Sequence, residues 1–93
     1  MPTLAFEWDR GKEAANRKKH GIDFGEASTV FGDPLSLTIA DPNHSTDEQR
    51  FVIVGASERR RVVVVVHTVR QERIRLISAR LATKSEKRSY EER

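Results

Sequence analysis

A run of five consecutive valines, Val62–Val66, constrains the fold of this chain more than any other feature. β-Branched side chains are restricted in helices and pack well on a pleated surface, so the run predicts a β-strand. No polar residue interrupts the run, which indicates that both faces of the strand are covered. The strand is expected to continue to Val69 and to lie at the centre of a sheet.

A second strand is predicted at Ile74–Arg80, with Ile74, Leu76 and Ser78 on one face and Arg75, Ile77 and Ala79 on the other. The connector between the two strands contains no glycine, so the hairpin is inferred from the strands and not from turn chemistry. A pairing of Val69 with Ile74 would make Val63 face Arg80.

The same register predicts how the polar side chains of the hairpin are grouped. His67 and Arg80 would share one face of the sheet, and Arg75 would lie on the other face. Because side chains in a strand alternate with a period of two, a slip of one residue would break this grouping.

The rest of the chain predicts two helices before the sheet and one after it. Asp9 can cap a helix that ends at Gly21, and Asp23 can cap a second helix that ends before Pro34. Further strands are expected at residues 3–8, 35–40 and 50–55, and a last helix after Thr83. This order indicates an α+β fold, a small antiparallel β-sheet with N-terminal helices packed on one face and a short C-terminal helix.

Length and composition are those of one small domain. Ninety-three residues are enough for a single core, so residues 1–93 are expected to form one unit. The absence of cysteine excludes a disulfide scaffold and a thiolate zinc site, and it fits a reducing compartment. No stretch approaches the roughly 20 apolar residues of a membrane span, so we expect a cytoplasmic protein with no membrane contact.

Charge is segregated along the chain, although the net charge is only +3. Five Lys or Arg accompany one Glu between Arg10 and His20, and seven accompany one Glu between Arg59 and Arg80. Six acids face one Arg in the intervening region, residues 23–50. Segregated basic surface is typical of proteins that bind polyanions, although a single charge run is more often a solvated face.

No metal ligands and no cofactor are expected. The polar residues of the segment 41–47 have the spacing of calcium-loop ligands, but Thr46 stands where that loop requires glycine and Val52 where it requires glutamate. A metal-dependent nuclease would need clustered carboxylates, and the acidic residues of this segment share only one loop.

Three stretches are distinctive when they are taken together. They are Phe6–Asp9 with Lys12 and Asn16; Lys19–Gly21 with Phe24, Ala27, Val30, Phe31, Asp33 and Pro34; and Ile77–Arg80 with Ala82, Glu86 and Tyr90. In combination they resemble the BrnT-type toxins, which are ribonucleases of bacterial type II toxin–antitoxin modules with a RelE-like fold. The resemblance covers nearly the whole chain.

The resemblance implies both an activity and a partner. The activity is metal-independent endoribonuclease cleavage of RNA, which inhibits translation and growth. The partner is a cognate BrnA-type antitoxin that neutralises the toxin in a tight complex. A dimer or a toxin–antitoxin heterotetramer is the assembly that the resemblance suggests.

Metal-free RNA cleavage needs a base, an acid and cations that stabilise the charge on phosphorus. Histidine titrates near neutral pH, glutamate can serve when burial raises its pKa, and arginine donates to phosphate oxygens. The candidate catalytic residues are Glu48, His67, Arg75 and Arg80. The residues expected to bind RNA are Lys12, Lys18, Lys19, His20, Arg50, Arg61 and Arg70.

Each candidate also has a purely structural interpretation. His67 could be a core histidine bonded to a nearby backbone group, and Glu48 could form a simple cross-strand ion pair with Arg50. Lys19 and His20 could merely complement the dipole of the first helix. The alternative to an endoribonuclease is therefore a non-catalytic basic module that binds nucleic acid or an acidic partner protein, and its expression would leave growth unaffected.

Overall fold

The computed structural model describes residues 4–41 and 48–92, and it confirms the expected α+β fold. Its elements in chain order are strand β1 (Phe6–Glu7), helices α1 (Arg10–His20) and α2 (Phe24–Thr29), the 3₁₀ turn η1 (Val30–Gly32), strands β2 (Leu37–Ala40), β3 (Phe51–Ala56), β4 (Val62–Arg70) and β5 (Arg73–Leu81), and helix α3 (Lys84–Glu91).

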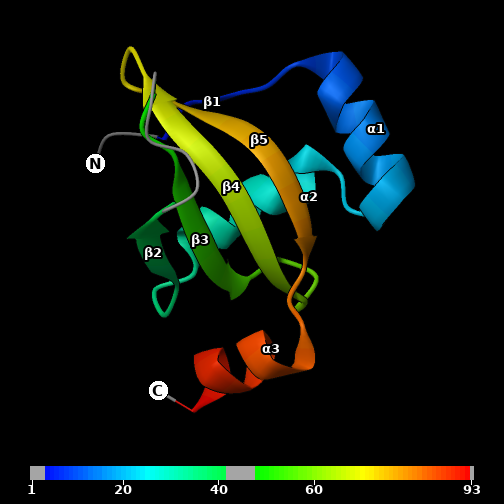
Figure 1. The fold of residues 1–93 in the computed structure, drawn as a ribbon, viewed down its shortest axis with the longest axis vertical. Coiled ribbons are helices and arrows are strands. Elements are labelled where there is room, and N and C mark those ends of the chain that lie inside the picture. Colours follow the sequence, from blue (N-terminus) through cyan, green and yellow to red (C-terminus); the bar gives the residue numbers. More distant parts are fainter. Residues whose placement is uncertain (1–3, 42–47, 93) are drawn as a thin grey trace.

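The strands form one sheet in the order β1-β5-β4-β3-β2 (Figure 1). The valine strand β4 is central, as predicted. Strands β2 to β5 pair antiparallel, whereas β1 pairs parallel with β5, so the sheet is mixed. Two helices and three strands separate β1 from β5 in the chain. A tight turn can join only antiparallel strands, whereas a connection this long also allows parallel pairing.

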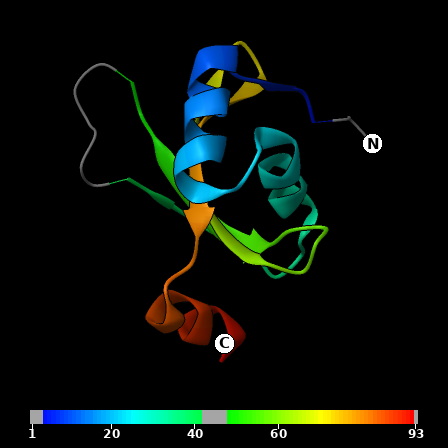
Figure 2. The same cartoon turned by 90° about the vertical axis from the view of Figure 1, so that its right-hand side faces the viewer.

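The core lies between one face of the sheet and the first two helices. Ile22, Phe24 and Val30 are fully buried against Val63 and Val65 of the central strand. Burial of an aliphatic or aromatic side chain of this size contributes about 1.5–3 kcal/mol. Figure 2 shows α1 and α2 together above α3, which lies apart at the end of the sheet.

Capping residues fix the ends of all three helices. Asp9 and Asp23 cap α1 and α2, and their carboxylates accept from backbone N–H groups three residues later at 2.8 and 2.7 Å. Gly21 ends α1 in the left-handed conformation, with φ 72°, which a side chain would strain. Thr83 and Glu86 form the predicted capping box at the start of α3.

The closed end of the β4–β5 hairpin has the predicted register, with Val69 opposite Ile74. The turn is made by Gln71 and Glu72, whose φ angles of 52° and 65° are both positive. Two consecutive positive φ angles are the geometry of a two-residue type I′ hairpin turn, here built without the usual glycine.

A β-bulge in β5 changes the register halfway along the hairpin. The pairs that flank it are Val66–Ser78 and His67–Leu76. Ile77 is therefore an extra residue in β5. Beyond the bulge Arg80 pairs with Val64, so the prediction that it faces Val63 is wrong.

The bulge also decides which arginines lie together. One extra residue reverses the face toward which all later side chains of a strand point. Arg80 consequently lies on the face opposite His67 and on the same face as Arg75, which pairs with Thr68. The predicted grouping of His67 with Arg80 is wrong for this reason. We call the face that carries the two arginines, opposite α1 and α2, the open face.

Candidate active site

The open face has an apolar centre with an arginine toward each end. The centre consists of Val52, Val54, Val64 and Val66. Arg75 and Arg80 come from the same strand and pair with Thr68 and Val64, which are four residues apart in β4. At about 3.3 Å per residue, their backbones are roughly 13 Å apart. The Arg75 Nη1 atom donates to Glu7 Oε2 at 3.0 Å.

Arg80 forms a bidentate ion pair with Glu86 of α3. Its Nη1 and Nη2 atoms donate to Glu86 Oε1 and Oε2 at 2.7 and 3.0 Å. The hydrogen bonds from Arg80, together with the one from the backbone N–H of Thr83, lower the pKa of Glu86 to about 2. Because the two side chains are 42% and 36% exposed, a phosphate group from solvent could compete with Glu86 for the guanidinium.

A second cluster of arginine and glutamate surrounds Glu48. Its Oε1 and Oε2 atoms lie 3.3 Å from Arg70 Nη2 and 3.7 Å from Arg50 Nη2. The Thr68 hydroxyl donates to the carbonyl oxygen of Gln49 at 2.7 Å, which ties this segment to the central strand. The structure thus brings together the predicted residues Glu48, Arg50 and Arg70.

His67 lies on the other side of the sheet, in the core. Its ring is 4% exposed and contacts Phe31 and Phe51, with ring centroids 4.8 and 5.7 Å away. Its Nδ1 atom lies 3.5 Å from the carbonyl oxygen of Val65. Burial lowers the pKa of His67 below its usual value. A catalytic role for His67 stays a prediction, and contact with RNA on the open face would require the core around it to open.

The lowered pKa of His67 predicts how stability depends on pH. An unfolded histidine has a pKa of about 6.5, so just below that pH the unfolded state binds more protons than the folded state. We therefore expect the free energy of unfolding to fall as the pH decreases below about 6.5. Urea unfolding between pH 5 and 7.5 measures this slope, which should be shallower in His67→Gln than in the wild type. His20→Gln, at the more accessible end of α1, is the control, and equal slopes for wild type and His67→Gln would contradict the prediction.

Arg61 has a structural partner. It forms an ion pair with the buried Glu26 of α2, in which Arg61 Nε donates to Glu26 Oε2 at 2.9 Å and Nη2 donates to Oε1. The hydrogen bond from Arg61 lowers the pKa of Glu26. Ser57 also donates to Glu26, at 2.7 Å, and Arg61 reaches the carbonyl oxygen of Gly21 at 3.5 Å. These contacts hold the β3–β4 turn against α2 and the end of α1.

The contact between Arg61 and Gly21 brings together two basic segments that are far apart in the sequence, the last turn of α1 and the β3–β4 turn. We call the two segments together the α1–turn surface, and their basic residues are Arg17, which also pairs with Glu13, and Lys18, Lys19, His20, Arg59 and Arg60. All of these side chains are exposed except His20, which is half-buried. Lys12 lies in the first turn of α1, at the opposite end of the helix. Arg59 and Arg60 were not among the predicted RNA-binding residues, although the run of three arginines signals them.

Helix α3 is held mainly by polar contacts, since none of its residues is buried. The Tyr90 hydroxyl donates to Asp33 Oδ2, which also accepts from the backbone N–H of Ala56 at 2.8 Å. Together with the Arg80–Glu86 pair, this contact holds α3 against the open face. Glu7 and Glu86, the carboxylate partners of the two arginines, were missed as site residues. The available signal was their place in the distinctive stretches, Glu7 in the first and Glu86 in the third.

A protein-family model described as "Ribonuclease toxin, BrnT, of type II toxin-antitoxin system" matches residues 8–86. The chain belongs to the BrnT family. This confirms the resemblance found in the sequence. The family description implies an RNA target and an antitoxin partner for this BrnT-family chain.

The crystal structure of the Brucella abortus ribonuclease toxin BrnT has the same fold. The match has a TM-score of 0.64 and 21% sequence identity, and it covers 88% of this chain and 100% of the Brucella chain. A search among functionally curated proteins gave no significant match.

Within residues 4–41 and 48–92, no group of three or more His, Cys, Asp or Glu side chains is arranged to hold a metal ion. In the same part of the chain, no helix is long and apolar enough to cross a membrane.

Proposed function

We propose that this BrnT-family chain is a metal-independent endoribonuclease that cleaves RNA in the cytoplasm, inhibits translation and growth, and is neutralised by a BrnA-type antitoxin. The observation that carries the proposal is the pair of arginines on the open face, each held by an accessible carboxylate. An RNA phosphate can replace such a carboxylate without exposing a buried charge, because both partners stay in contact with solvent.

Arg80 is the proposed phosphate-binding residue. Its planar guanidinium can donate two parallel hydrogen bonds to phosphate oxygens, as it does to Glu86. It would also stabilise the negative charge that develops on phosphorus in the transition state. Arg75, farther along the same strand, would bind another phosphate of the same RNA.

The displaced carboxylate is a candidate base. When a phosphate binds Arg80 in place of Glu86, the carboxylate loses the hydrogen bonds that contribute most to its low pKa, and the pKa rises, while the backbone N–H of Thr83 still donates to Glu86. Glu86 can then accept the proton of the 2′-hydroxyl while the 2′-oxygen bonds to phosphorus and the bond to the 5′-oxygen breaks. The 5′-oxygen leaves with a proton from an acid, for which Glu48 and His67 are the predicted candidates.

The α1–turn surface supports the proposal because it offers exposed cations for phosphates beyond the cleavage point. Each phosphate contact with single-stranded RNA is expected to contribute about 0.7 to the slope of log affinity against log salt concentration. The predicted RNA-binding residues Lys18, Lys19 and His20 belong to this surface. Arg61 instead holds its two segments together through hydrogen bonds to Glu26 and Gly21.

One observation favours the alternative, a non-catalytic basic module. On the described part of the open face, the glutamates near the arginines are already in ion pairs: Glu7 with Arg75, Glu48 with Arg70 and Glu86 with Arg80. His67 is buried, so none of these candidate acids and bases is available before another contact is broken. A module of this kind would bind RNA or an acidic protein through its basic surface and cleave nothing.

Growth separates the two functions. Induction of the wild-type chain in bacteria that lack the antitoxin is expected to stop growth, and co-expression of the antitoxin is expected to restore it. Total RNA taken during the arrest should contain new internal ends. Normal growth with abundant folded protein would favour the binding module.

A further inference from the structure

Strand β2 forms an unprotected edge of the sheet. It is the last strand in the order, and all four of its residues are exposed. Leu37 and Ile39, two residues apart, are 50% and 63% exposed, which is high for side chains of this kind. Natural proteins usually cover or charge an edge of this type, because it invites pairing with another chain.

The backbone of β2 offers hydrogen bonds at this edge. The N–H of Asp41 donates to the carbonyl oxygen of Arg50 at 2.8 Å, and antiparallel ladders alternate between bonded and outward-facing residues. The register then makes Leu37 and Ile39 bond to β3, and it turns the N–H and C=O groups of Thr38 away from the sheet. Within the described residues no hydrogen bond engages these groups of Thr38.

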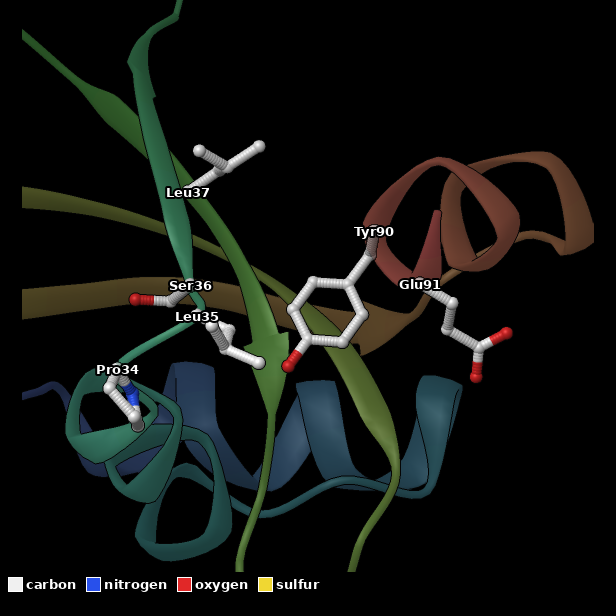
Figure 3. Close-up of a pocket in the computed structure, with 6 residues that line it drawn as sticks. All are labelled: Pro34, Leu35, Ser36, Leu37, Tyr90 and Glu91. Carbon is white, nitrogen blue, oxygen red and sulfur yellow. The ribbon is translucent and has the colours of Figure 1, made fainter. Parts of the chain in front are cut away.

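Two cavities flank β2 where it meets α3. The larger, about 700 Å³, is lined by Leu35, Leu37 and Tyr90 among others, and Figure 3 shows the Tyr90 ring directed from α3 toward these residues. The smaller, about 320 Å³, lies between α3 and the apolar centre of the open face, and it is lined by Leu37 and Ile39 as well. Alternate side chains of a strand added beside β2 would point toward this apolar surface.

The charge around β2 distinguishes between possible occupants. Strand β2 itself carries no charged residue, and Asp33 and Asp41 stand on either side of it in the chain. Arg50 lies opposite Asp41, and Arg80 lines the smaller cavity. RNA is disfavoured at the edge itself, because β2 offers no cation to a phosphate. A second copy paired around a two-fold axis would bring the same carboxylates near one another, so charge disfavours it as well.

We propose that β2 is the docking edge for an extended segment of the antitoxin, which adds a strand beside Thr38. This segment has alternating apolar residues that lie over Leu37 and Ile39, and it has Lys or Arg at its ends, opposite Asp33 and Asp41. Strand addition of this kind derives affinity from main-chain hydrogen bonds and specificity from alternate side chains. The inference rests on the proposed function only for the identity of the partner.

Thr38→Pro tests the edge directly. Proline removes the outward N–H of Thr38 but none of the hydrogen bonds between β2 and β3, and edge strands tolerate it. Thr38→Val is the matched control, because it retains the N–H and suits a strand. With the purified cognate antitoxin in a calorimetric titration, we expect Thr38→Pro to bind at least tenfold more weakly than the wild type and Thr38→Val to bind like the wild type. Ile39→Lys should also weaken binding, through repulsion of the basic ends.

Wild-type affinity in Thr38→Pro would overturn the proposal, and so would equal losses in Thr38→Pro and Thr38→Val. A free chain that dimerises, with the dimer lost in Thr38→Pro, would assign the edge to a second copy and overturn it too. Cleavage of RNA by free Thr38→Pro is expected at the wild-type rate. If neither protein cleaves RNA but only Thr38→Pro loses the antitoxin, the proposed ribonuclease activity fails while the docking edge stands.

Discussion

Replacement of Arg80 by alanine is expected to lower the rate of RNA cleavage by about 10²–10³-fold, the usual effect of removing one donor that stabilises a transition-state oxyanion. The Arg80 guanidinium already binds the Glu86 carboxylate through two parallel hydrogen bonds, the bidentate geometry in which arginine also binds phosphate. Initial rates on a labelled RNA, measured for variants with matched melting temperatures, give the comparison. Arg10→Ala, which removes an exposed charge at the start of α1, is the control and should cleave like the wild type.

Two companion variants separate the roles of the Arg80–Glu86 pair. Arg80→Lys keeps the positive charge but loses the two parallel N–H donors of the guanidinium. Its cleavage rate should therefore lie between those of Arg80→Ala and the wild type. Glu86→Gln removes the charge that competes with phosphate, and we expect a lower KM together with a lower kcat, because the base is lost. A higher kcat in Glu86→Gln would show that Glu86 only competes with RNA. A wild-type rate in Arg80→Ala would remove Arg80 from the site.

Asn16→Ala is expected to reduce the free energy of unfolding by about 2–4 kcal/mol, since unsatisfied buried polar groups cost about 1–3 kcal/mol each. The side chain of Asn16 is 8% exposed and joins α1 to two other segments. Its Nδ2 donates to the carbonyl oxygens of Ile22 and Ala79 at 3.1 and 2.9 Å, and its Oδ1 accepts from the N–H of Ala79 at 3.0 Å. Alanine leaves all three backbone groups without these partners.

Urea denaturation measures this loss. Lys19→Ala on the exposed side of the same helix is the control, and a surface change of this kind stays within about 0.5 kcal/mol of the wild type. A loss below about 1 kcal/mol in Asn16→Ala would mean that water replaces the amide, and that the contact between α1 and β5 depends on apolar packing instead.

The parts of the fold that follow from local sequence were predictable. The valine run identified the central strand, because β-branched residues without a polar break suit a strand that is covered on both faces. Asp9, Gly21, Asp23 and Thr83 marked helix ends, because capping acts within a few residues of the chain. In each case the residues that determine the structure are neighbours in the sequence.

The bulge at Ile77 was not predictable in the same way. The adjacent apolar residues Leu76 and Ile77 interrupt the alternation in β5, but two such residues also fit an unbroken strand that is covered on both faces, and no glycine marks the extra residue. Its position depends on how Leu76 and Ala79 both reach the core, where they are 2% and 1% exposed. This packing turns Arg80 to the open face, and with it the composition of the candidate site.

The surroundings of His67 and Arg61 depend on contacts between distant segments. Phe31 and Phe51 enclose His67 from two different elements, and Glu26 is 35 residues from Arg61. A sequence contains both members of such pairs but not their proximity. The sequence alone could therefore not show that aromatic rings enclose His67.

The most direct test of the central claim is cleavage of a labelled RNA by the purified, antitoxin-free chain in excess chelator, with and without added ribosomes. We expect internal cleavage that persists in the chelator, is abolished by the antitoxin and is strongly reduced in Arg80→Ala. No cleavage by the folded wild type under either condition, or cleavage that appears only when a divalent metal ion is restored, would contradict a metal-independent ribonuclease.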